Sequence, residues 1–359
     1  MQEIIIGPNQ AGQRFDKFLH KYLPEAGNSF LYKMLRKKNI TLNGKKAEGK
    51  ELLCEGDVVK MFFAEETLRK FAGRAMEKNS GSAAQNFDIS GVPGRSNLNT
   101  ESADLLYDKG LGLRSNTLYF QAYSQLHDIS VIYENESMIV LNKPAGILTQ
   151  KAKATDLSLN EWLIGYLLES GMITEEELHT FRPSVCNRLD RNTSGLVLCG
   201  KSLHGSQTLS ELIRTRQIQK YYRTICVGKI DAPAYIEGYL EKDERTNKVR
   251  ISPRREDGDL IRTAYRPLSA NEKFTLLEVE LITGKTHQIR AHLASIGHPL
   301  IGDYKYGRRE INSRLKKEYG LEWQLLHAHR MVFPDGREIV APCPEQFERI
   351  VVGLLSPEM

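Results

Sequence analysis

The stretch from Asn187 to Leu198, Asn-Arg-Leu-Asp-Arg-Asn-Thr-Ser-Gly-Leu-Val-Leu, most constrains what this chain can fold into. Its polar head holds one carboxylate, Asp190, between the guanidinium groups of Arg188 and Arg191. The apolar run 195–199 follows a Thr-Ser-Gly turn and is typical of a buried strand. Most charged loops of this kind are structural, with the carboxylate neutralised by its neighbours. The rest of the chain must therefore decide whether Asp190 carries chemistry.

Length and composition indicate an ordinary globular protein. The 359 residues are enough for two domains with separate cores, and 40% of them are hydrophobic and 26% charged. No apolar run approaches the length of a membrane span, and the first residues do not resemble a signal peptide. We therefore expect a cytoplasmic protein. Five widely spaced cysteines without a CxxC pair argue against a disulfide framework and a zinc site.

Positive charge is concentrated at the start of the chain. Residues 1–64 hold 11 Lys and Arg against 7 Asp and Glu, which accounts for most of the net charge of +5. Such a local surplus indicates contact with a polyanion, most simply a nucleic acid. A solvated basic face would give the same count, so charge alone leaves both interpretations open.

Residues 13–63 are predicted to form a small α+β unit. An apolar stripe predicts a helix over 15–22, and Ser29 can cap a second, basic helix over 30–38. A strand at 40–42 precedes Asn43-Gly44, a strong hairpin signal, and another strand is expected at 58–62.

This unit resembles an S4 RNA-binding domain over nearly its full length, through RFDKFL, the basic helix and ITLNGKKAEG followed by GDVV. In that family the second helix and the following loop contact RNA. The resemblance implies that the contacts here are Lys33, Arg36, Lys37, Lys38, Lys45 and Lys46. Basic side chains clustered on a rigid helix displace counterions from a phosphate backbone, which agrees with this implication.

Residues 65–127 have a different character. Ser, Asn and Gly are frequent from 79 to 99, and no periodicity persists beyond a possible short helix at 68–76. We expect a flexible linker or insertion. The run 117–123 has a strand-like composition but too little context for an assignment.

A second domain is predicted over 128–359. It is rich in strands with helices interspersed and shows no regular βαβ alternation, so a mixed, largely antiparallel α+β sheet is expected. The predicted helices lie between Ser158 and Gly171, at 204–215 and at 288–296. Strands are predicted at 131–133, 138–141, 195–199, 221–227, 248–251, 262–265 and 274–282.

The usual catalytic motifs are missing from the sequence. It contains no GxxxxGK[ST], GxSxG or HExxH segment. The histidine pairs 287/292 and 327/329 do not have the spacing of a convincing metal site. We therefore expect no nucleotide cofactor, flavin or metal.

Four segments of the second domain together resemble RluA-type pseudouridine synthases. They are VLNKPAGILTQ (140–150), NRLDRNTSGLVLCGKS (187–202), KYYRTICVG (220–228) and LEVELITGKTHQIRAHLASIGHPLIGDYKYG (277–307). The resemblance covers essentially all of 128–350, and an amino-terminal S4 domain is a frequent companion in that family.

The resemblance implies an enzyme that breaks the N1–C1′ bond of uridine, turns the base and rejoins it through C5. No atom is lost, so no cofactor is required. Asp190 matches the catalytic aspartate, as nucleophile or as partner in proton abstraction from the sugar, and these alternatives stay open. Arg290 matches the arginine that pairs with the aspartate, and Tyr222 the tyrosine that stacks beneath the uracil. Arg188 matches the residue that fills the space left by the flipped nucleotide.

Two features depart from the family pattern. Asn187 stands where many members have histidine before the RLD, and the segment 65–127 exceeds the usual linker. The predicted function is pseudouridine formation in large-subunit ribosomal RNA by a monomeric protein. A catalytically inactive, RNA-binding ribosome-assembly factor is the main alternative. A nucleoside or nucleotide glycosidase is disfavoured because the motifs lack a second carboxylate.

Overall fold

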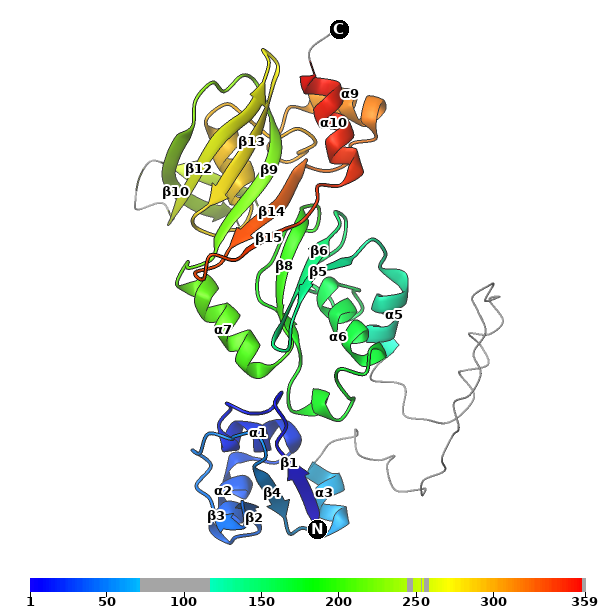
Figure 1. The fold of residues 1–359 in the computed structure, drawn as a ribbon. Coiled ribbons are helices and arrows are strands. Elements are labelled where there is room, and N and C mark those ends of the chain that lie inside the picture. Colours follow the sequence, from blue (N-terminus) through cyan, green and yellow to red (C-terminus); the bar gives the residue numbers. More distant parts are fainter. Residues whose placement is uncertain (72–116, 244–247, 253, 255–257, 357–359) are drawn as a thin grey trace, which may run out of the picture. The chain divides into compact units, whose positions relative to one another are not determined.

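The computed structural model describes residues 1–71, 117–243, 248–252, 254 and 258–356 (Figure 1). The chain divides into two compact units, and each is described by itself. The first comprises Met1–Leu118 with Thr174–Thr180, and the second Tyr119–Ile173 with Phe181–Met359. No helix within the described ranges combines the length and the apolar character that crossing a bilayer requires.

The first unit is a four-stranded antiparallel sheet with helices packed against it. The strand order is β1-β4-β2-β3. The helices predicted at 15–22 and 30–38 and the strands at 40–42 and 58–62 are confirmed to within two residues, and β1 was not predicted. The expected cap by Ser29 is wrong, because α2 begins one residue before it and its N-cap is Gly27. The possible helix at 68–76 begins earlier, as α3, and its predicted end lies outside the described residues. The bounds are β1 Gln2–Ile5, α1 Phe15–Tyr22, α2 Asn28–Arg36, β2 Ile40–Leu42, β3 Lys45–Lys46, β4 Val58–Met61 and α3 Glu65–Phe71.

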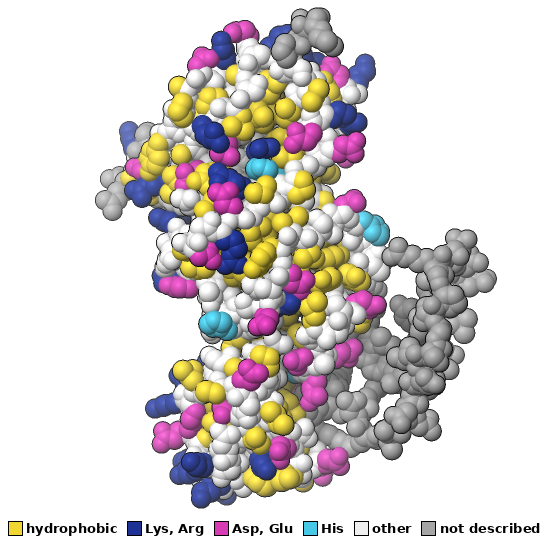
Figure 2. Space-filling model, viewed as in Figure 1, with side chains coloured by type: hydrophobic (Ala, Val, Ile, Leu, Met, Phe, Trp, Pro, Cys, Tyr) yellow, Lys and Arg dark blue, Asp and Glu magenta, His cyan; other side chains and the backbone are white. Residues whose placement is uncertain are grey.

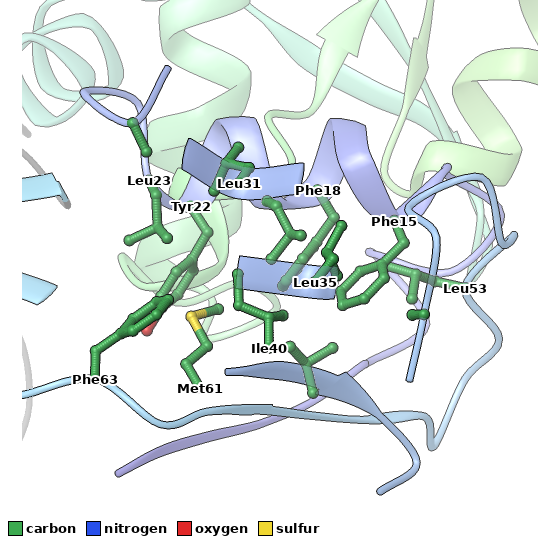
Figure 3. Packing of buried hydrophobic residues seen from close by; sticks show 14 of the residues in the cluster. Phe15, Phe18, Tyr22, Leu23, Leu31, Leu35, Ile40, Leu53, Met61 and Phe63 are labelled. Carbon is green, nitrogen blue, oxygen red and sulfur yellow. The ribbon is translucent and has the colours of Figure 1, made fainter. Parts of the chain in front are cut away.

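The core of this unit lies between α1, α2 and the sheet (Figure 3). Phe15 and Phe18 of α1 and Leu35 of α2 meet Ile40 and Met61 of the strands, and all five are fully or almost fully buried. The spacing of the apolar residues in α1 and α2 therefore supplies the face that each helix buries. Their basic residues are left on the outer surface.

The predicted hairpin at Asn43-Gly44 is confirmed. Both residues have positive φ, 52° and 71°, and the turn joins β2 to β3. Positive φ at both central positions is the type I′ geometry that Asn-Gly favours. The hairpin presents Lys45 and Lys46 as exposed side chains on a short edge strand.

The second unit is built on one large mixed sheet. Its order is β11-β10-β12-β13-β9-β14-β8-β6-β5, with β15 beside β14 and β7 beside β8. In the described part of the chain, every pair is antiparallel except β8 with β14. The strands are β5 Ser130–Glu134, β6 Met138–Lys143, β7 Ser184–Val185, β8 Ser194–Gly200, β9 Gln219–Val227, β10 Ala234–Asp243, β11 Lys248–Ser252, β12 Asp259–Ala270, β13 Phe274–Leu281, β14 Leu326–Val332 and β15 Glu338–Val340. The predicted α+β class with a largely antiparallel sheet is confirmed.

Helices cover this sheet at several places (Figure 1). α7 packs on β8, α10 on β13, and α8 lies over β10, β11 and β12. The helices predicted as 204–215 and 288–296 are α7 and α8. The bounds are α5 Thr117–Gln125, α6 Leu159–Glu169, α7 Leu203–Arg214, α8 Gln288–Ser295, α9 Arg309–Tyr319 and α10 Glu345–Leu355.

α6 begins and ends where the sequence predicts. The Ser158 hydroxyl accepts a hydrogen bond from the backbone N–H of Asn160, and Gly171 lies just beyond the helix with φ of 68°. A side-chain cap at the start and a left-handed glycine after the end are the usual helix boundaries.

The run 117–123, whose composition is strand-like, belongs instead to helix α5. Its aromatic residues pack on α6: the Tyr123 ring lies 5.6 Å from Trp162 and 6.3 Å from Tyr166 between centroids. A Cβ added to Gly165 would lie 2.4 Å from the Tyr119 carbonyl oxygen, so the two helices are in close contact. Tertiary packing thus overrides the strand preference of aromatic residues. The described ends of the segment 65–127 are both helical, whereas 72–116, where a flexible linker was predicted, lie outside the described residues.

Candidate active site

A pocket of about 360 Å³ lies within the second unit. The loop before β8 forms one wall, with Asn187, Arg188 and Asp190. Lys220 and Tyr222 of β9 form a second wall. The turn 282–287 and the first residues of α8 form a third wall. The structure thus brings Asp190, Tyr222, Arg290 and Arg188 to one pocket, as the resemblance implied.

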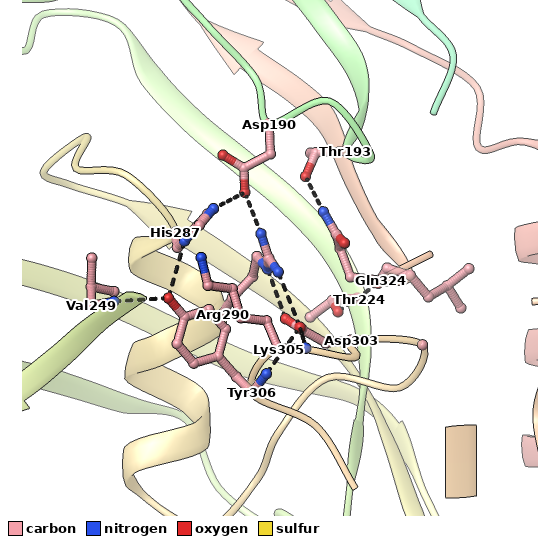
Figure 4. Close-up of polar contacts among 12 residues, drawn as sticks. Asp190, Thr193, Thr224, Val249, His287, Arg290, Asp303, Lys305, Tyr306 and Gln324 are labelled. Atoms are coloured by element: carbon pink, nitrogen blue, oxygen red, sulfur yellow. Dashed lines mark hydrogen bonds and ion pairs between the residues drawn. The ribbon is translucent and has the colours of Figure 1, made fainter. Parts of the chain in front are cut away.

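Asp190 is held by a guanidinium that bridges two carboxylates (Figure 4). Arg290 Nη1 donates to Asp190 Oδ2 at 2.9 Å. The same guanidinium donates from Nε and Nη2 to the two oxygens of Asp303, at 2.7 and 3.0 Å. The Asp303 side chain is fully buried, whereas that of Asp190 keeps 25% exposure. Asp303 therefore fixes the plane of the guanidinium, and Arg290 in turn orients the exposed carboxylate.

Asp303 and Arg290 stabilise each other's charged form inside this chain of contacts. Burial alone would raise the pKa of Asp303, but Arg290 and the backbone N–H groups of Lys305 and Tyr306 outweigh burial, so the pKa is lowered. Burial would lower the pKa of Arg290, and Asp303 more than compensates. Both groups are therefore ionised at neutral pH, and a fixed positive charge stands beside Asp190.

The loop that carries Asp190 is braced by side chains from the segment 143–149. Lys143, which is fully buried, donates from Nζ to the carbonyl oxygens of Pro144, Ile147 and Arg191, at 2.8 to 3.0 Å. The Thr149 hydroxyl accepts from the N–H of Leu189 and donates to its carbonyl. The backbone on both sides of Asp190 is therefore tied to the segment after β6.

The far end of the loop is bonded to β14 and to Gln324, which lies just before that strand. Gln324 donates to the Thr193 hydroxyl at 3.2 Å, and the Ser194 hydroxyl lies 2.9 Å from Nδ1 of His327. Gly195 has φ of 113°, and a Cβ there would lie 2.3 Å from the Ala328 carbonyl oxygen. Only glycine allows this approach, which places the Thr-Ser-Gly turn directly against β14.

Asn187, which departs from the family pattern, is bonded to the backbone of β8. Its Oδ1 accepts from the N–H of Leu198 at 2.7 Å, and its Nδ2 donates to the carbonyl of Leu196 at 3.4 Å. The side-chain amide thus makes the hydrogen bonds to β8 that the backbone of a neighbouring strand would otherwise make. An imidazole could not offer a donor and an acceptor to these two backbone groups in the same geometry.

Tyr222 is buried on the wall of the pocket, with 5% of its surface exposed. Burial, and next the charge of Asp190, raise the pKa of its phenol well above the ordinary value. It therefore stays protonated at neutral pH. Tyr221 points to the opposite face of β9, as expected for neighbouring residues of a strand, and Arg330 stacks on its ring at 4.0 Å.

His287 and Tyr306 complete the surroundings of Asp190 and were not singled out from the sequence. His287 Nε2 lies 3.8 Å from Asp190 Oδ2, and Nδ1 lies 3.0 Å from the Tyr306 hydroxyl. That hydroxyl also accepts from the N–H of Val249, so one ring nitrogen of His287 contacts Tyr306 and the other faces Asp190. Burial lowers the pKa of His287 despite Asp190, so the ring is neutral at pH 7.

Asp303, Lys143 and Thr149 were also missed as site residues, although they stand in the segments that carry the family resemblance. Their importance depends on contacts between segments far apart in sequence, 48 residues for Lys143 and Arg191 and 13 for Arg290 and Asp303. The signal that could have found Lys143 and Asp303 is a charged residue inside or beside an apolar run, which must find a partner when buried.

Arg188 and the six basic residues of the first unit that are predicted to contact RNA are all exposed. Within the described ranges, none of them forms an ion pair. Lys33 and Arg36 lie on α2, Lys37 and Lys38 directly follow it, and Lys45 and Lys46 form β3. Figure 2 shows Lys and Arg side chains gathered at this part of the first unit.

One group of side chains has the composition of a metal site. Ligand atoms of His327, His329 and Cys343 lie within 4.8 Å of one another. Arg223, however, lies with Nη1 4.0 Å from Cys343 Sγ, and both imidazoles already contact the Ala341 carbonyl. Burial lowers the pKa of both histidines, to about 4 for His327, with Arg223 contributing. A guanidinium beside the thiol opposes a bound cation, so the cluster fits a structural role better.

Comparisons with known proteins agree with this geometry. Residues 137–295 match the family described as RNA pseudouridylate synthase. Ribosomal large subunit pseudouridine synthase C of Vibrio vulnificus is 27% identical over 99% of this chain and 96% of its own length. Ribosomal large subunit pseudouridine synthase D of Borreliella burgdorferi is 29% identical over 64% of this chain and 68% of its own.

The fold is also found among solved structures. The human RNA Pseudouridylate Synthase Domain Containing 4 superposes with a TM-score of 0.52 at 23% identity, over 67% of this chain and 97% of that one. The matched segment 137–295 contains Asp190, Tyr222 and Arg290. Residues 137–295 therefore match the RNA pseudouridylate synthase family, and relatives named as ribosomal large subunit pseudouridine synthases are similar to almost the whole chain.

Proposed function

We propose that this enzyme converts uridines of large-subunit ribosomal RNA to pseudouridine and that Asp190 is its essential carboxylate. The observation that carries the proposal is the Asp190–Arg290–Asp303 arrangement at the wall of the pocket. Among the described residues that line the pocket, Asp190 is the only carboxylate. Glycoside hydrolysis typically needs two, whereas an isomerisation that loses no atom needs one.

The contacts of Asp190 support a role beside C1′ of the sugar. Arg290 binds Oδ2 and leaves Oδ1 without a contact to the guanidinium. That oxygen can attack C1′ or take part in removing a proton from the sugar. Detachment of N1, rotation of the uracil and attachment of C5 to C1′ follow, and any bond between Asp190 and C1′ breaks as the new bond forms. Loss of the proton from C5 and protonation of N1 then give the product. A protonated Tyr222 on the pocket wall offers its ring as a surface on which the uracil can stack.

The target base must leave its stack to reach a pocket of this size, at a cost of a few kcal/mol. Arg188 stands exposed at the pocket and has no ion pair with any described residue. We assign it the space left by the flipped nucleotide. Its delocalised charge suits both stacking and contact with phosphate.

Large-subunit ribosomal RNA is proposed as the substrate because two relatives that align with this chain over 96% of their length are named ribosomal large subunit pseudouridine synthases. We further propose that the first unit is an S4 domain that binds this RNA. Six exposed basic side chains on and after α2 and on β3 support this assignment. The inactive assembly factor is disfavoured, because such a protein would not need the bridged carboxylates around Asp190.

Mapping pseudouridine in the ribosomal RNA of a strain that lacks the gene tests the proposal. The missing positions should return with the wild-type gene and not with Asp190→Asn, which keeps the shape of the side chain and removes its charge. RNA affinity should stay within about tenfold. Asp335→Asn, at an exposed carboxylate between β14 and β15, is the matched control and should restore the positions. Modification by Asp190→Asn at wild-type level would refute the role of Asp190, and an unchanged map in the deletion strain would refute the substrate.

A further inference from the structure

Five cations line the pocket, and they fall into two groups. Lys285 and Arg290 have carboxylate partners: Lys285 Nζ lies 2.6 Å from Asp259, and Arg290 bridges Asp190 and Asp303. Arg188, Arg216 and Lys220 form no ion pair within the described part of the chain. Pairing therefore leaves a surplus of positive charge on one side of the pocket.

Lys220 differs from the other two because it is half-buried, whereas Arg188 and Arg216 are exposed. Burial, and next the nearby charge of Arg216, lower the pKa of its ammonium. Placing a cation in such a position beside a like charge costs free energy that no described neighbour compensates. An anionic ligand would supply the missing partner.

The strand geometry places Lys220 next to the proposed base site. Lys220 and Tyr222 are two residues apart on β9 and face the same side, separated by roughly 6.6 Å along the strand. The ammonium lies above the turn before α8, since a Cβ added to Gly284 would be 3.6 Å from Lys220 Nζ. Arg216 stands four residues earlier, at the turn between α7 and β9. A nucleotide stacked on Tyr222 thus has a cation within reach of its backbone.

We propose that Lys220 and Arg216 form a phosphate subsite that binds the phosphodiester adjoining the flipped uridine. The inference rests on the proposed function and deepens it, because it names the group that anchors the flipped nucleotide. Lysine suits this role as a compact point charge. Arg188 remains available for the space within the RNA stack.

Nucleotide binding tests the subsite without requiring catalysis. Uridine, uridine 5′-monophosphate and uridine 3′-monophosphate are titrated into the full chain, and binding is followed by calorimetry or by chemical shifts. One of the two monophosphates should bind about tenfold more tightly than uridine, as expected for one charge-assisted contact. Lys220→Gln should abolish that advantage, and Lys220→Arg should keep most of it.

Lys229→Gln is the matched control, because Lys229 lies just beyond the other end of β9 and is paired with Glu272. It removes one positive charge from the same unit and should leave the preference for monophosphate unchanged. On ribosomal RNA, Lys220→Gln should raise KM more than it lowers kcat and reduce the salt slope of binding by about one.

Stability separates this role from a structural one. The Lys220 ammonium has no acceptor or carboxylate among the described residues, so Lys220→Gln should unfold at the same temperature as the wild type or a higher one. A lower unfolding temperature, or equal binding of uridine and both monophosphates by the wild type, would overturn the subsite. If the wild type forms no pseudouridine but still prefers a monophosphate, the proposed function fails and the subsite stands.

Discussion

The loop 187–194 and the six basic side chains on and after α2 and on β3 differ in how their polar groups are paired. We call these six side chains the basic surface of the first unit. In the loop, the backbone and side chains around Asp190 are bonded to distant segments, as with Lys143 and Arg191 or Gln324 and Thr193. On the basic surface, six side chains on and after α2 and on β3 are exposed and form no ion pair with any described residue. Satisfied bonds fix the position of Asp190, whereas unpaired charges remain available for a partner.

The two regions should therefore respond differently to change. A buried network loses free energy steeply when one member is removed, because the remaining members keep unsatisfied groups. An exposed cluster loses affinity in proportion to the charge removed, and salt screens it. Each prediction below tests one side of this contrast.

Arg290→Met should have the largest effect. It leaves the fully buried Asp303 without its cation and Asp190 without its orienting donor. Breaking a buried pair in this way costs about 3–5 kcal/mol, and pseudouridine formation should fall below detection. Denaturant unfolding and single-turnover assays on ribosomal RNA measure the two losses.

The double variant Arg290→Met/Asp303→Asn separates these losses. Removing the second charge should recover much of the stability, because no uncompensated carboxylate remains buried. Activity should not return, because Asp190 still lacks Arg290. Recovery of activity together with stability would mean that Arg290 acts only on the fold.

Lys143→Met should come next. The substitution keeps an unbranched chain up to Cε and removes the ammonium donor from three carbonyl oxygens, of which that of Arg191 keeps the N–H of Gly146. We expect a loss of a few kcal/mol at pH 7 and a fall in kcat of about a hundredfold, because small displacements of a catalytic group are costly. RNA affinity should change little. A variant with wild-type kcat would show that Lys143 does not position Asp190.

Lys143 also predicts a dependence of stability on pH. Burial lowers its pKa in the folded protein to about 7, although Asp190 opposes the shift. An unfolded lysine keeps its ordinary pKa, so between pH 7 and the ordinary value the unfolded chain binds more protons and the folded state gains stability as pH rises. The free energy of unfolding of the wild type should therefore gain a contribution between pH 7 and pH 9 that the Lys143→Met variant lacks. Denaturant unfolding at the two pH values should show a larger stability difference between the two proteins at pH 9 than at pH 7. Equal pH dependence of the two proteins would contradict the lowered pKa.

An element could be predicted from the sequence where the residues that determine it lie close together along the chain. Local patterns were enough for α1, α2, the Asn43-Gly44 hairpin and the Ser158 cap, because their causes lie within a few residues. They were misleading for 117–123, where contact with α6 decides the conformation. β10, β14, β15, α9 and α10 were not assigned, since neighbouring strands and helices supply their burial.

The candidate site shows the same limit. Family motifs pointed to Asp190, Tyr222 and Arg290, and the structure places all three at one pocket. No pattern along the chain indicated that Arg290 also binds Asp303, because that bond depends on how the segment after α8 returns to the helix. The roles of the three residues remain predictions that the experiments above address.

Asn187→Ala should lower the free energy of unfolding less than Arg290→Met or Lys143→Met does. It leaves the N–H of Leu198 without its acceptor in a buried strand, at a cost of about 1–2 kcal/mol. Asn187→His, which introduces the residue common in the family, should cost a similar amount here. Asn192→Ala is the control from the same loop, because Asn192 Oδ1 is buried and has no hydrogen-bond partner among the described residues. A larger loss of stability for Asn192→Ala than for Asn187→Ala would contradict the role of Asn187 as a backbone partner.

The triple variant Lys33→Gln/Lys37→Gln/Lys38→Gln should leave stability and kcat unchanged, because none of the three side chains has an ion pair in the described ranges. Affinity for ribosomal RNA should fall, and the slope of log affinity against log salt should decrease by about 2, as expected for three contacts to single-stranded phosphate. Replacing three exposed lysines of the second unit, Lys273, Lys316 and Lys317, removes the same charge. If both triple variants lose the same affinity and slope, the first unit contributes only general charge and its proposed S4 role is wrong. If only the first does, the unpaired charge on and directly after α2 is a binding surface, and the contrast with the hydrogen-bonded loop around Asp190 holds.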